Sequence, residues 1–85
     1  MNTDTQAMKN AAAWLHANNS TLAAVLRFYS ERMGDNAVDL RDLAAKGGNA
    51  RITADAAAGL AADFEQRQQH ATRLQNELYE LSHRA

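Results

Sequence analysis

The feature that most constrains this chain is its C-terminal segment, which runs from residue 54 to residue 83 with no helix breaker except Gly59. Its apolar residues are separated by alternating steps of four and three, and Arg67 fills the one gap. That spacing places them on one stripe of a long helix. The stripe consists of Leu60, Phe64, Ala71, Leu74, Leu78 and Leu81. The segment therefore predicts one long helix over about 54–83 and raises the question of what covers its stripe.

The rest of the chain also predicts helix. There is no proline, good helix formers dominate, and no alternating strand pattern occurs. Three short helices are expected before the long one, over about 4–17, 21–33 and 37–46. The breaks between them are assigned to "ANNS" (17–20), to Gly34 and to the pair Gly47 and Gly48, with Thr53 as the cap of the long helix. The prediction is an all-α, single helical domain spanning 1–85, a small bundle.

The expected core is thin. The chain has 85 residues and is 46% hydrophobic, but 19 of its residues are alanine, which buries little area. The second predicted helix carries the clearest face of larger side chains, formed by Leu22, Val25, Leu26, Tyr29 and Met33. A domain of this size gains stability from oligomerisation or from a partner.

Composition also limits the class of protein. The formal net charge is −1, which disfavours a broad surface for nucleic acid or membrane. There is no run of 18 apolar residues, and "MNTDTQAMKN" lacks the order of a signal peptide. The absence of cysteine fits a reducing compartment. The expectation is a cytoplasmic protein without a membrane span.

The geometry of the predicted helices suggests a homodimer. A helix over 54–83 is roughly 45 Å long, about twice the length of either of the first two. The half beyond Phe64 should therefore overhang with its leucines bare, and a second copy of the same helix would cover it in a coiled coil through residues 64–84. The expected interface residues are Phe64, Ala71, Leu74, Leu78, Tyr79 and Leu81. A helix from a different protein would serve equally well, and the sequence does not choose between the two.

No residue pattern predicts catalysis, a metal or a cofactor. The three histidines do not pair at helical spacing, and Asp35, Asp39 and Asp42 lack the remaining ligands of a calcium loop. "KGGN" is too short for a phosphate cradle, and no serine lies in a nucleophile motif. We therefore expect a protein that is not an enzyme.

Two functions follow as hypotheses. The first is a protein-binding module, a small inhibitor or adaptor that occupies a partner protein's surface. An origin in a phage or mobile element is a further hypothesis, which no residue of the sequence supports. The alternative is a small dimeric DNA-binding regulator that uses the helices on either side of "KGGNARIT", with Arg41, Lys46 and Arg51 as phosphate contacts. The long connection and the scarcity of base-reading side chains disfavour it.

Overall fold

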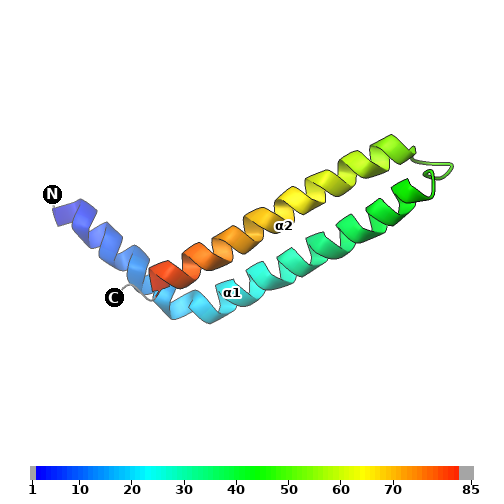
Figure 1. Ribbon diagram of the computed structural model, residues 1–85. Coiled ribbons are helices and arrows are strands. Elements are labelled where there is room, and N and C mark those ends of the chain that lie inside the picture. Colours follow the sequence, from blue (N-terminus) through cyan, green and yellow to red (C-terminus); the bar gives the residue numbers. More distant parts are fainter. Residues whose placement is uncertain (1, 83–85) are drawn as a thin grey trace.

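The chain folds into a hairpin of two long antiparallel helices (Figure 1). In this computed structural model, which describes residues 2–82, α1 spans Asn2–Ala45 and α2 spans Ala54–Ser82. The hairpin measures 59 × 24 × 17 Å and has a radius of gyration of 18.5 Å. The all-α prediction is confirmed, and the molecule is extended.

The predicted division of residues 4–46 into three short helices is wrong, because α1 continues through both expected breaks. At the first break, Asn18 Nδ2 donates a 2.8 Å hydrogen bond to the Trp14 carbonyl four residues earlier. The side chain thus bonds the backbone of the preceding turn without ending the helix. The helix does change direction in its light-blue part, beside the end of α2 (Figure 1).

The second expected break, at Gly34, is a place of close approach between the helices. Positive φ angles occur among the described glycines only at Gly47 and Gly48, so Gly34 keeps helical geometry. A Cβ atom placed on Gly34 would lie 2.5 Å from Nε2 of Gln68 on α2. The missing side chain therefore makes room for Gln68, and contact between the helices outweighs the cost of a glycine inside a helix.

The turn at residues 46–53 follows the sequence prediction. Gly47 (φ 91°) and Gly48 (φ 81°) adopt the left-handed conformation that ends a helix. Gly48 N–H donates to the Leu43 carbonyl at 2.9 Å, and Gly47 N–H donates to the Ala44 carbonyl at 3.1 Å. This pair of bonds is a Schellman motif.

The start of α2 is capped as predicted. Thr53 Oγ1 accepts a hydrogen bond of 3.1 Å from Ala56 N–H. Before it, Asn49 Oδ1 accepts from the N–H groups of Arg51 and Ile52. The Asn49 side chain thus accepts hydrogen bonds from backbone N–H groups of the connection, and the Thr53 side chain accepts one from the start of α2. The chain therefore reverses direction without further loop residues.

Small side chains fill the contact between the helices. The buried residues are Ser30 and Ala37 on α1 and Ala57, Ala61, Ala71, Leu78 and Ser82 on α2. The hydroxyl oxygens of Ser30 and Thr72 lie 3.3 Å apart across the contact. No large side chain of the described residues is fully buried. The core is therefore as thin as the alanine content predicts.

The helix that overhangs is α1, whereas the sequence predicted an overhang of the C-terminal helix, α2. Because α1 has 44 residues and α2 has 29, α1 is longer by 15 residues, or roughly 22 Å. The unpaired end is the N-terminal part of α1, which projects past the end of α2 (Figure 1). The prediction that α2 overhangs beyond Phe64 is wrong, since Ala71 and Leu78 are buried. Residue 83 of the predicted long helix and residue 84 of the predicted interface lie outside the described residues.

Candidate functional site

The leucine stripe of α2 does not coincide with the line of residues that packs on α1. Phe64, Ala71 and Leu78 belong to both. The remaining stripe positions, seven residues apart, are Leu60, Arg67, Leu74 and Leu81. At 100° per residue, their mean direction lies roughly 80° around the helix from the residues that face α1. Half of the stripe is therefore turned to one flank of the hairpin.

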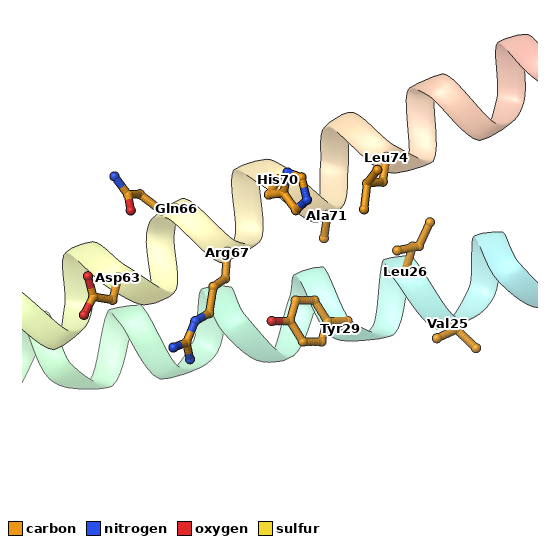
Figure 2. A pocket seen from close by; sticks show the side chains of 9 residues that line it. All are labelled: Val25, Leu26, Tyr29, Asp63, Gln66, Arg67, His70, Ala71 and Leu74. Atoms are coloured by element: carbon orange, nitrogen blue, oxygen red, sulfur yellow. The ribbon is translucent and has the colours of Figure 1, made fainter.

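On that flank the two helices form an open apolar groove. Its larger part has a volume of about 730 Å³, and a part of about 300 Å³ continues it toward the end of α2. Its apolar lining consists of Leu15, Leu22, Val25, Leu26 and Tyr29 of α1 and Ala71, Leu74, Leu78 and Leu81 of α2. Figure 2 shows Leu26 of α1 and Ala71 and Leu74 of α2 pointing into the space between the helices. We call this surface the flank groove.

The lining of the flank groove is exposed to an unusual degree for apolar side chains. Val25 is 58% exposed, Leu81 51% and Leu74 37%. Phe28, 71% exposed, lines an adjoining hollow with Arg32. Isolated exposed leucines are ordinary, but a contiguous apolar patch rimmed by polar residues is typical of an interaction surface.

The polar margin of the flank groove belongs to α2 and carries charges of both signs. It consists of Asp63, Gln66, Arg67, His70 and Glu77. Arg67 reaches from α2 toward α1 (Figure 2), with its guanidinium carbon 5.3 Å from the centre of the Phe64 ring. Within residues 2–82, neither Arg67 nor the margin's two carboxylates take part in an ion pair. Their charges are thus available to a partner.

The structure separates the six predicted interface residues into three groups. Ala71 and Leu78 are buried against α1, and Phe64 is partly buried under Arg67. Leu74 and Leu81 lie in the flank groove. Tyr79 is 63% exposed and lies roughly 140° around α2 from Leu74, on the other flank. The six residues therefore do not form one surface.

The three predicted phosphate contacts do not form one basic patch either. Arg41 Nη2 lies 2.7 Å from Glu65 Oε1 in a two-bond ion pair between the helices, and Lys46 Nζ lies 2.8 Å from Asp42 Oδ2. Hydrogen bonding and attraction to these carboxylates raise the pKa of Arg41 and Lys46, and the Arg41 guanidinium lowers the pKa of Glu65. Of the three cations, only Arg51 has no ion pair within residues 2–82.

Sequence reasoning missed the contribution of α1 to the groove. The apolar face with Val25 and Tyr29 was visible in the sequence. However, it was assigned to a short helix ending at residue 33, and that helix was expected to bury the face in the core of a bundle. The signal that could have located the groove is the presence of two apolar stripes on one helix, since a hairpin contact uses only one.

Other kinds of site find little support among the described residues. Residues 2–82 contain no group of three or more potential metal ligands and no helix long and apolar enough to cross a membrane. Comparisons with protein-family models, with curated proteins and with solved structures found no match to this chain.

Proposed function

We propose that this chain is a non-enzymatic protein-binding module that acts by burying the flank groove against a helical surface of another protein molecule. The observation that carries the proposal is the exposure of Val25, Leu74 and Leu81 along one continuous groove. Burial of such side chains is the main source of affinity in protein association.

The shape of the flank groove favours a helix as the binding element. The groove runs between two antiparallel helices, and its lining repeats at helical spacing on both. An amphipathic helix lays its apolar face into such a groove through residues spaced three, four and seven apart. The charges of Asp63, Arg67 and Glu77 along one margin would then fix the orientation and register of the bound helix.

A small-molecule site is less well supported. The volume of about 730 Å³ falls in the range of small-ligand sites. Such sites are enclosed and contain a few polar groups that converge on the ligand. Here the polar groups stand along the margin, and the lining is an open strip of mainly aliphatic side chains with one aromatic ring, Tyr29.

Photo-crosslinking in cells that make the protein tests the proposal. A photoreactive amino acid at Val25, at the α1 edge of the groove, should give a discrete protein adduct that Leu74→Glu abolishes. The same amino acid at Val38 is the matched control, because Val38 is 67% exposed and lies on the opposite flank of α1. An absence of adducts at Val25, or equal adducts at Val25 and Val38, would contradict the proposal.

A further inference from the structure

We propose that the protein which covers the flank groove is a second copy of this chain, so that two hairpins pack face to face as a four-helix bundle. This inference rests on the proposed function, since it names the occupant of the same groove. It differs from a coiled coil of two α2 helices, because the faces that meet come from both helices of each hairpin.

The first argument is the angle between the two stripes on α2. In a four-helix bundle each helix has two neighbours, in directions about 90° apart in a square arrangement, and it needs an apolar stripe toward each. The stripe toward α1 contains Ala61, Ala71 and Leu78, and the second contains Leu74 and Leu81. Their separation of roughly 80° matches that arrangement.

A similar offset is present on α1. Ser30 and Ala37 face α2, and Val25 and Tyr29 lie roughly 110° around the helix on the side of the groove. Both helices therefore lack one neighbour on the same flank. A second hairpin supplies two helices at once, whereas a single foreign helix seated in the groove supplies one.

The second argument is surface area. The chain exposes 6558 Å², while a compact monomer of its mass, 9.3 kDa, is expected to expose about 5,000 Å². The excess of roughly 1,500 Å² exceeds the area of about 800 Å² that each partner loses in a stable interface of standard size. The chain as a whole, its overhanging end included, thus leaves more area unburied than one side of a dimer interface needs.

The third argument is charge. The margin of the flank groove holds Asp63 and Glu77 together with Arg67 and His70, so it carries both signs on one edge. When the two-fold axis runs across the helices, α2 of one copy lies beside α2 of the other, and the two margins can then set a cation of one copy against a carboxylate of the other. The formal net charge of −1 adds little repulsion between two copies.

The test is the mass of the purified protein in solution, by light scattering across a dilution series, with two matched variants. Wild-type protein should have twice the chain mass of 9.3 kDa. Val25→Glu should raise the dissociation constant about a hundredfold, because both copies lose one buried valine and each loss weakens association roughly tenfold. Val38→Glu, on the opposite flank, should leave the dimer intact.

A variant that unfolds is also informative. If folding depends on the dimer, Val25→Glu loses its helical circular dichroism while Val38→Glu keeps it, and the wild-type melting temperature rises with protein concentration. A wild-type mass of 9.3 kDa at all concentrations, or equal effects of the two variants, would overturn the inference. If the protein is a monomer and a photoreactive amino acid at Val25 crosslinks a different protein, the inference that a second copy occupies the groove is overturned, but the proposed function stands.

Discussion

Glycine-to-alanine substitutions at two positions test the hairpin quantitatively, because the same chemical change should have opposite effects. Gly59 lies inside α2, is exposed, and has helical geometry. A Cβ atom built there meets nothing within 4 Å. Alanine in a helix interior is favoured over glycine by about 1 kcal/mol, because glycine loses more backbone entropy on folding. Gly59→Ala should therefore raise the melting temperature by roughly 4–8 °C.

Gly48 presents the opposite case. Its φ of 81° is a conformation that costs other residues about 1–2 kcal/mol. A Cβ atom there would lie 2.8 Å from the backbone nitrogen of Ala54 and in closer contact still with the Ile52 carbonyl oxygen. Backbone atoms cannot move aside as the end of a flexible side chain can. Gly48→Ala should therefore lower the melting temperature by roughly 4 °C or more.

The measurement is thermal unfolding followed by circular dichroism, with all proteins at one concentration, because self-association would make the melting temperature depend on concentration. A destabilising Gly59→Ala would mean that another helix approaches closely at Gly59, which no contact of the described residues indicates. A neutral Gly48→Ala would refute the turn geometry at residues 46–53.

Three further predictions concern the helix contact and the charged residues. Ala61→Leu should destabilise the hairpin by about 1–3 kcal/mol in chemical denaturation, because Ala61 is fully buried between the helices, whereas Ala62→Leu on the exposed face should change little. Arg41 lowers the pKa of Glu65 in the folded state. The stability that this ion pair contributes is therefore present at neutral pH and is lost as the pH falls through the lowered pKa. The acid-induced drop in melting temperature should accordingly be smaller in Glu65→Gln than in the wild-type protein. Fluorescence anisotropy with duplex DNA should show no salt-sensitive binding, and a wild-type affinity that falls steeply with salt and is abolished by Arg51→Glu would instead support the DNA-binding alternative.

The sequence by itself determined the helical class and the position of the reversal. Gly47 and Gly48 mark the end of α1 because glycine adopts positive φ at little cost, and Thr53 marks the start of α2 because its hydroxyl caps a free N–H. These signals act within a few residues of the chain. A local pattern is therefore enough to predict them.

Only the tertiary structure decided whether the weaker breaks would end a helix. Gly34 and Asn18 have low helix propensity, but the penalty of about 1 kcal/mol or less at each position is smaller than the gain from packing one long helix along α2. Gly34 even contributes to that packing, since it makes room for Gln68. The balance depends on contacts with residues more than thirty positions away, which no local pattern contains.

The position of the flank groove depends on the same long-range contacts. The spacing of leucines showed that α2 carries a stripe, but the stripe is wider than a single helix contact needs. Packing of Ala57, Ala61 and Ala71 against α1 allows the closest approach of the two helices, and it turns Leu74 and Leu81 to the flank. Which apolar residues are covered and which stay exposed is thus set by the rotation of α2 about its own axis, and that rotation is fixed only when α1 lies beside it.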